Sequence, residues 1–369
     1  MPLSKIQFGN TGRRNIIING GMQVAQRNST SAVTSVNGNY HTVDRVKATF
    51  VTSGTAQTQQ VTDVPAGEGF SHSMKTTVTG ADTSIAGGDF FDLYQQRIEA
   101  RSISTLMYGT SGAKRTSLSF YVKSNVTGVY NGTITNQNDT VKLPFSFSIS
   151  SANTWERIII DNIPPITTGS DSGTAWETST YLNLGATVRI YGVLGSNYYG
   201  ATNKVWNTAG TATSYGHQAQ VNFLSSTSNN FFITGVQWEE GSAATEFEHR
   251  TYAEELADCQ RYFIRVPDSN ASSAYAFLAT GMATDTTTVD IPFPFPVTMR
   301  ANPTLATSGS IRVYNGGTVN PSSGITLYSG STYAGVVRVT TGSVLSTKDA
   351  ILVGLNNDVD ANFQFSAEY

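Results

Sequence analysis

The stretch SLSFYVKS, residues 117–124, decides the fold class expected for this chain. Every second side chain in it is apolar, and these are Leu118, Phe120 and Val122. The positions between them are polar or amphipathic: Ser117, Ser119, Tyr121 and Lys123. Because successive side chains of a strand point to opposite faces, this alternation predicts a half-buried β-strand.

Similar short segments recur along the chain with turn residues between them, at 45–51, 129–135, 155–161, 186–194 and 231–238. Parallel sheets require helical crossovers, which this pattern lacks, so we expect antiparallel sheets packed as a sandwich. The pattern resumes after Pro267, at 275–283, 310–315, 334–341 and 350–356. We therefore expect an all-β protein of two sandwiches, 13–250 and a smaller one over 267–369, preceded by an N-terminal arm, 1–12.

Residues 251–266 are expected to form a helical connector, with the helix itself over 252–265. Thr251 and Glu254 have the spacing of a capping box. An apolar stripe follows at spacings of four, three and four residues: Tyr252, Leu256, Cys259 and Phe263. So short a helix is marginal alone, which leaves two roles open for the stripe: docking on its own chain, or self-association at a symmetry axis.

Composition limits the classes of partner. Only 13% of residues are charged, the formal net charge is −3, and no Lys/Arg run occurs, so we expect neither nucleic acid nor an anionic membrane as a partner. No segment approaches the ~20 apolar residues that cross a bilayer, and MPLSKIQFGN lacks a signal-peptide core. Synthesis in a cytoplasm is expected. Cys259 is the single cysteine, which excludes an internal disulfide.

No motif predicts catalysis, a metal site or a cofactor. The densest acidic cluster is Glu239, Glu240, Glu246 and Glu248, where we expect turn and cap residues rather than the carboxylate pair of a glycosidase. The histidines are scattered, at positions 41, 72, 217 and 249. The prolines at 292, 294, 296 and 303 favour an edge strand or an extended arm.

Aromatic residues gather in GSNYYGATNKVWNTAGTATSYGHQ, residues 195–218: Tyr198, Tyr199, Trp206 and Tyr215. Sugar binding needs flat aromatic faces together with amide and hydroxyl groups, and this stretch supplies both kinds. The alternative is that Trp206 and one tyrosine fold inward and close one end of the sandwich. Within the N-terminal arm, Leu3, Ile6 and Phe8 are candidate docking residues for another protein.

Several segments together resemble, in order, a family of phage and prophage virion proteins described as tail-fibre or other appendage proteins. They are RRNIIINGGMQVAQR (13–27), YHTVDRV (40–46), FSHSMKTTVTGADTS (70–84), SLSFYVKSNVTGVY (117–130), SANTWERIIIDNIP (151–164), FFITGVQWEEGSAATEFEHRTYAEELADCQRYF (231–263) and PFPFPVTMRANPTL (292–305). The first part also resembles jelly-roll carbohydrate-binding modules, with NGGM near its start and FFITGVQWEEG as the closing strand. Those modules often carry a calcium-holding Asp in the closing strand, where this chain has Thr234 and Gly235.

The resemblance implies a jelly-roll-like first sandwich in a non-enzymatic component of an external virion appendage. Such a tail fibre would be a homo-oligomer, favoured as a trimer, that contacts other virion proteins and a host surface glycan. Two alternatives stay open: a head fibre, collar or decoration protein without a receptor role, and a fibre enzyme that degrades polysaccharide.

Overall fold

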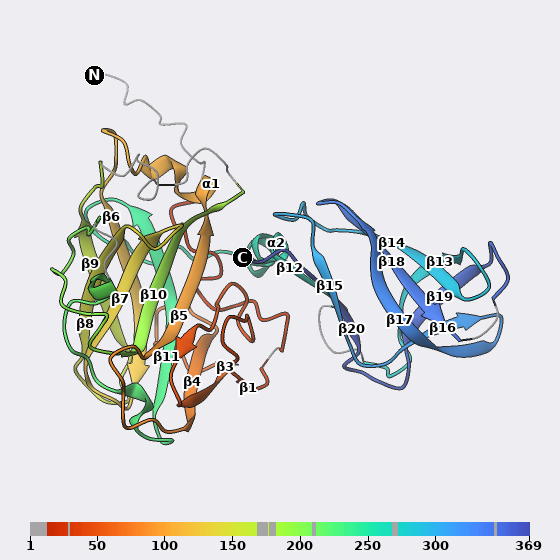
Figure 1. The fold of residues 1–369 in the computed structure, drawn as a ribbon, viewed down its shortest axis with the longest axis horizontal. Coiled ribbons are helices and arrows are strands. Elements are labelled where there is room, and N and C mark those ends of the chain that lie inside the picture. Colours follow the sequence, from red (N-terminus) through yellow and green to blue (C-terminus); the bar gives the residue numbers. More distant parts are fainter. Residues whose placement is uncertain are drawn as a thin grey trace. The chain divides into compact units, whose positions relative to one another are not determined.

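The computed structural model describes residues 13–28, 30–167, 176, 182–208, 212–267, 272–342 and 345–369. The chain forms two compact units, Met1–Thr251 and Tyr252–Tyr369 (Figure 1). The division falls next to the end expected for the first sandwich, and the helix belongs to the second unit. The predicted arm 1–12, with Leu3, Ile6 and Phe8, lies outside the described residues.

The first unit is a sandwich of two antiparallel sheets. The six-stranded sheet contains, in spatial order, β1 (Val33–Thr34), β3 (Thr55–Val61), β4 (Ser73–Gly80), β11 (Asn230–Glu240), β6 (Thr116–Ser124) and β9 (Glu156–Ile163). The five-stranded sheet contains β2 (Phe50–Val51), β5 (Phe90–Glu99), β10 (Leu184–Leu194), β7 (Gly128–Asn136) and β8 (Lys142–Ile149). Short helical turns are α1 (Ala100–Ile103), η1 (Ser104–Leu106), η2 (Ala212–Ser214) and η3 (Phe223–Ser225). The all-β fold class expected from the sequence is confirmed.

Strand β6 shows why the alternation predicts this sandwich. Leu118, Phe120 and Val122 are fully buried in a core that both sheets share. The opposite face of β6 is less exposed than its polar residues suggest, because Ser117 and Ser119 are buried as well. β6 lies between β11 and β9, and the Ser117 hydroxyl donates to the Gly241 carbonyl at 2.9 Å, so the segment after β11 covers this face.

The N-terminal segment runs alongside β11 and completes the six-stranded sheet. Ile16 N donates to the Trp238 carbonyl at 2.8 Å, and Val236 N donates to the Gly20 carbonyl at 3.0 Å. A Cβ at Gly20 would lie 2.1 Å from the Val236 carbonyl oxygen, so only glycine permits this close approach. Asn15 joins the same strand through its side-chain amide, which donates to Val236 O and accepts from Trp238 N.

The second unit differs from the small sandwich expected over 267–369. Six strands close into a barrel: β13 (Phe277–Ala283), β14 (Thr288–Pro294), β18 (Ala334–Thr341), β17 (Thr318–Gly330), β16 (Ile311–Asn315) and β19 (Ala350–Leu355). A three-stranded sheet contains β12 (Phe263–Val266), β20 (Asn362–Ser366) and β15 (Thr304–Ser308). The barrel closes because β17, interrupted by two bulges against β18, also pairs with β16, and β13 pairs with both β14 and β19.

The stretch 286–299, which its prolines were predicted to make an edge strand or an extended arm, lies partly inside β14. Pro292 and Pro294 pair with β18, and β14 is a barrel strand. This is tolerated because β13 pairs with β14 only at Val289 and Asp290, so the prolines lie beyond the end of β13. The local edge was predicted correctly, although the strand as a whole belongs to the barrel.

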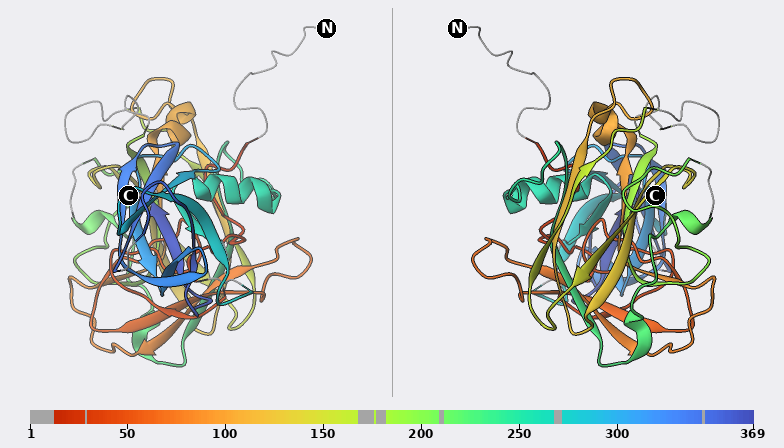
Figure 2. Two further views of the ribbon diagram at one scale, coloured as in Figure 1. Left: turned by 90° about the vertical axis from the view of Figure 1, so that its right-hand side faces the viewer. Right: turned by 90° about the vertical axis from the view of Figure 1, so that its left-hand side faces the viewer.

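The predicted helix is shorter than expected. α2 spans Tyr252–Gln260 and is the teal helix in Figure 2. Phe263, assigned to the helix stripe, instead lies in β12 and pairs with Ser366 of β20. Pairing with β20 captures the aromatic and β-branched run after Gln260, which overrides the helical spacing. Of the remaining stripe, Cys259 is buried and Leu256 is half-buried, whereas Tyr252 is 54% exposed. None of the helices in the described residues is long and apolar enough to cross a membrane.

Candidate functional site

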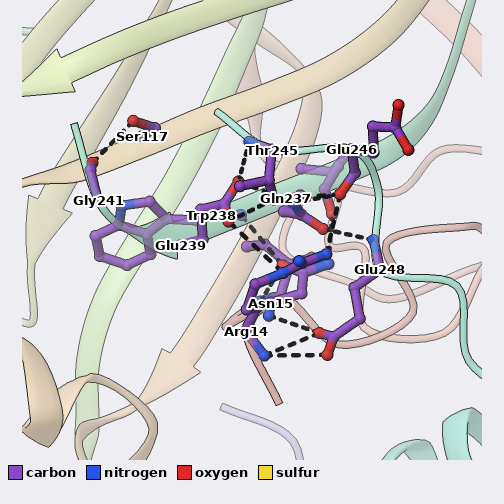
Figure 3. A network of polar contacts seen from close by, with 12 residues as sticks. Arg14, Asn15, Ser117, Gln237, Trp238, Glu239, Gly241, Thr245, Glu246 and Glu248 are labelled. Atoms are coloured by element: carbon purple, nitrogen blue, oxygen red, sulfur yellow. Dashed lines mark hydrogen bonds and ion pairs between the residues drawn. The ribbon is translucent and has the colours of Figure 1, made fainter. Parts of the chain in front are cut away.

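The acidic cluster at the end of β11 and in the segment after it is a structural network (Figure 3). The Glu248 carboxylate accepts hydrogen bonds from the backbone N–H of Arg14, at 3.0 and 3.1 Å, and of Asn15, at 2.7 Å. Glu239, 1% exposed, accepts from the backbone N–H and the hydroxyl of Thr245 at 2.8 and 2.7 Å. Because charged acceptors make strong hydrogen bonds to N–H groups, these two carboxylates fasten the N-terminal segment and the chain after β11 to the sandwich.

The other two glutamates of the cluster have different surroundings. Glu240 is half-exposed and forms an ion pair with Lys114 at 2.7 Å. Glu246 contributes its backbone carbonyl, which accepts from Arg14 Nη2 and Gln237 Nε2, each at 3.1 Å. The cluster is therefore used for tertiary structure. This differs in part from the turn and cap roles expected from the sequence, because Glu239 is buried within β11.

Thr234 and Gly235, the positions considered for a calcium-holding Asp, lie at a β-bulge. Register with β6 shifts between Thr234 and Gln237, and Gly235 has a φ of 63°. The Thr234 hydroxyl donates to the His72 carbonyl at 2.8 Å. Within the described parts of the chain, no three or more His, Cys, Asp or Glu side chains group in a way that could hold a metal ion.

Of the four aromatic residues predicted to contact glycan, Trp206 lies in a separate cluster. Its ring packs edge-on against Tyr108 at 5.7 Å and Trp176 at 5.5 Å between centroids, beside the main core. Its indole N–H donates to the Pro164 carbonyl at 2.8 Å. Both features place Trp206 in the packing of the sandwich, the alternative left open by the sequence.

The structure brings the other three, Tyr198, Tyr199 and Tyr215, together. Tyr215 N and Gly216 N both donate to the Tyr198 carbonyl, at 3.0 and 2.9 Å, and Tyr199 forms a β-bridge with Gly216. The Tyr198 ring stands edge-on to Tyr215 at 5.8 Å between centroids, and to Phe90 at the same distance. All three tyrosines are half-buried, and we refer to them as the tyrosine roof.

The tyrosine roof is tied to the outward face of the five-stranded sheet. Along β7 the alternate residues Tyr130 and Ile134 enter the core, so Asn131 and Thr133 point the other way. The Asn131 amide donates to the Gln218 carbonyl at 2.7 Å and accepts from His217 N at 2.9 Å. The Thr133 hydroxyl donates to the Tyr215 carbonyl. These bonds fix the loop and hence the position of its rings.

Charged side chains lie beneath and beside Tyr215. Arg189, on β10, forms an ion pair with Asp139 at 3.0 Å, and its guanidinium carbon is 5.8 Å from the Tyr215 ring centroid. Lys142 Nζ, on β8, is 4.7 Å from the same centroid. Cations at such distances attract the aromatic face. The Asp139 and Arg189 side chains remain 33% and 14% exposed, so this pair and the tyrosine rings form the accessible part of the site.

Burial perturbs the ionisable groups of this face. Burial raises the pKa of Tyr215 to about 12 and lowers the pKa of Lys142. Burial also raises the pKa of Asp92 to about 7, against an opposing effect of Arg189 and a smaller addition from Asp139. In the described structure both Asp92 carboxylate oxygens are closed to solvent and have no hydrogen-bond partner. Asp92 is therefore protonated through much of the acidic range.

Sequence reasoning missed the charged and polar residues of the site. Arg189 lies in ATVRIYGVL and Asn131 in VYNGTIT, both of which were read only as strands. The signal that could have found Arg189 and Asn131 is that polar residues occupy alternate positions in each segment. That signal does not say which sheet carries the strand or which loop covers it, so Asp92, Asp139 and Arg189 could not be joined to the tyrosines.

No protein-family model matches the chain, and no curated protein matches its sequence. Solved structures similar to it include the enzymatically active domain of tailspike protein 4 of bacteriophage CBA120, at 14% identity and a TM-score of 0.29 over 62% of this chain and 21% of that one. A family 11 carbohydrate-binding module of a Clostridium thermocellum cellulase matches at 10% identity and a TM-score of 0.28, over 60% of this chain and 99% of the module. A family 22 module of Clostridium thermocellum Xyn10B matches at 11% identity and a TM-score of 0.27, over 57% and 98%.

Proposed function

We propose that the first unit binds a carbohydrate of a host cell surface, and that the chain is a non-enzymatic component of an external phage appendage. The observation that supports binding is the tyrosine roof beside the Arg189–Asp139 pair. Half-buried rings offer apolar faces to a sugar ring, while the guanidinium and carboxylate offer a donor and an acceptor to its hydroxyls. Fixed rings also lose little conformational freedom on binding.

The appendage role is supported by the segments that resemble those of virion proteins and follow one another in the same order along the chain. In this role the chain is a homo-oligomer, with a trimer favoured, and its partners are other virion proteins. Weak contacts to a repeated surface add up when several copies are linked, so the affinity of each site need only be modest. A head fibre, collar or decoration protein without a receptor role is the alternative.

A second candidate function is polysaccharide hydrolysis, which one observation favours. Two carboxyl groups in different environments interact electrostatically with Arg189: Asp92, whose pKa burial raises to about 7, and Asp139, which is ion-paired. An acid and a base separated in pKa are what glycoside hydrolysis needs. Closure of the Asp92 oxygens to solvent opposes this function, because a substrate oxygen would have to reach them.

The two functions are separated by measuring binding and cleavage on an array of bacterial surface polysaccharides. The binding proposal predicts retention of the intact chain on a subset of polysaccharides, without new reducing ends, and a loss of at least about tenfold for Tyr198→Ala or Tyr199→Ala. Trp206→Phe is the matched control, because that ring lies in the separate cluster. Release of reducing ends that Asp92→Asn abolishes would establish hydrolysis instead.

A further inference from the structure

The outer face of the second unit carries an exposed tyrosine that is held flat against a charged pair. Tyr328, on β17, is 59% exposed. The guanidinium carbon of Arg338, on β18, lies 3.4 Å from the centroid of the Tyr328 ring, the distance of direct stacking. One face of the ring is therefore occupied by Arg338.

Arg338 is itself fixed. Its Nε and Nη2 donate to the two carboxylate oxygens of Asp290, on β14, at 2.7 Å each. This two-point geometry restrains both position and plane of a guanidinium, so Arg338 serves as a rigid base for the ring. Asp290 and Arg338 are also direct cross-strand partners, and Thr326 of β17 is the next residue in the same row. Tyr328, Arg338 and Asp290, which we call the platform, thus lie on three strands of a closed barrel.

Packing does not explain this arrangement. Val337, Val339 and Ile291 on the same strands point into the barrel core, so Arg338 and Tyr328 lie on the outward face. An exposed tyrosine gains little stability from its ring, whereas a ring fixed on one side offers its other face to a ligand at a low entropic cost. The exposed hydroxyl of Thr326 and the charged pair supply hydrogen-bonding groups beside the ring.

Charge indicates the class of ligand. Asp290 neutralises Arg338, so the platform has no net charge with which to attract the phosphates of a nucleic acid or an anionic lipid. An apolar ring face bordered by neutralised polar groups instead fits an uncharged sugar ring, which has apolar C–H faces and hydroxyls at its edge. In the first unit, Tyr215 of the tyrosine roof lies beside the Arg189–Asp139 pair, which gives the same three residue types.

We propose that Tyr328, with Arg338 and Asp290, forms a second carbohydrate-binding site, and that it binds a neutral hexose unit of a surface polysaccharide. The assignment stands on the second unit's own residues and does not require the first site to bind sugar. With both sites active, one chain contacts a polysaccharide at two points, and the combined affinity exceeds either alone.

The test is affinity electrophoresis of the full chain through gels that contain dextran, mannan or galactan. We expect at least one of them to retard the parent protein, and Tyr328→Ala to weaken that retardation by about tenfold. Phe277→Ala is the matched control, since Phe277 is 52% exposed on β13 of the same barrel and should leave retardation unchanged. The same pair of variants is made in a chain that also carries Tyr198→Ala and Tyr199→Ala.

The outcomes separate the two sites. Retardation that survives the first-unit substitutions and is removed by Tyr328→Ala supports the second site. This result holds whether or not the first site binds sugar. The proposal is overturned if none of the three polysaccharides retards the parent, if Tyr328→Ala behaves like the parent, or if Phe277→Ala loses as much. It is also overturned if Tyr328→Ala changes only the mass measured by light scattering, which would make this face a contact between copies of the chain.

Discussion

Replacing Asp92 by Asn should change how the stability of the first unit depends on pH. Asp92 is 5% exposed, and burial raises its pKa from 3.8 to about 7. Below pH 3.8 the group is protonated in both folded and unfolded chains and has no effect. As the pH rises towards about 7, the unfolded chain releases this proton while the folded protein keeps it, so the free energy of unfolding falls.

The size of the effect follows from the width of that interval. One pKa unit corresponds to ~1.4 kcal/mol. Between pH 5 and pH 8 the decline covers about two pH units, because it ends near the folded pKa of about 7, so Asp92 should lower the free energy of unfolding by about 3 kcal/mol. Asn has the same shape and carries no charge, so Asp92→Asn should lack this decline. Relative to the parent, the variant should gain about 3 kcal/mol over the same pH interval.

Urea unfolding followed by tryptophan fluorescence measures this directly, because all four tryptophans lie in the first unit: Trp155, Trp176, Trp206 and Trp238. The control is Asp161→Asn, whose carboxylate is 55% exposed and should leave the pH profile of the parent unchanged. Parallel profiles for the parent and Asp92→Asn would refute the argument, since they would show that Asp92 is equally ionised in the folded and unfolded chains.

Three further predictions concern packing, polar contacts and assembly. Gly20→Ala places a Cβ 2.1 Å from a carbonyl oxygen of β11 and should lower the free energy of unfolding, measured in urea, by about 3 kcal/mol or more. Its control is Gly88→Ala, which has nothing within 4 Å of its Cβ and should change that free energy by less than about 0.5 kcal/mol. Glu248→Gln weakens bonds to two backbone N–H groups and should lower the free energy of unfolding by about 2 kcal/mol. Glu240→Gln, at its half-exposed ion pair, should lower it by less than about 1 kcal/mol. Equal losses would contradict the structural role of Glu248. By light scattering the parent should have three times the 39.5 kDa chain mass and Leu256→Asp the mass of one chain, while a monomer in both cases would remove α2 from the assembly.

The strands were predictable because their periodicity is strong and local. SLSFYVKS places Leu118, Phe120 and Val122 on one face whatever else the chain does. Barrel closure in the second unit was not predictable, because it depends on β13 pairing with β19, at residues far apart in the sequence. The end of α2 was misjudged for the same reason: Phe263 fits the helical spacing, but strand pairing with β20 decides its conformation.

The site was predictable only in part. The tyrosines of the roof were visible in the sequence as aromatic residues in a loop rich in Gly, Ser, Thr and Asn. Their neighbours were not, since Arg189 and Asp139 become adjacent to Tyr215 only when β7, β10 and the loop are assembled. Trp206 shared the loop's composition, yet contacts with Tyr108 and Trp176 place its ring in another cluster.

Carbohydrate binding by the tyrosine roof is tested most directly by isothermal titration of the full chain with the polysaccharide that retains the chain best on the array. We predict a Kd at least about tenfold weaker for the chain with both Tyr198→Ala and Tyr199→Ala, and an unchanged Kd for Trp206→Phe. An unchanged Kd in the tyrosine variant, or an array on which no polysaccharide retains the chain, would contradict carbohydrate binding by the tyrosine roof.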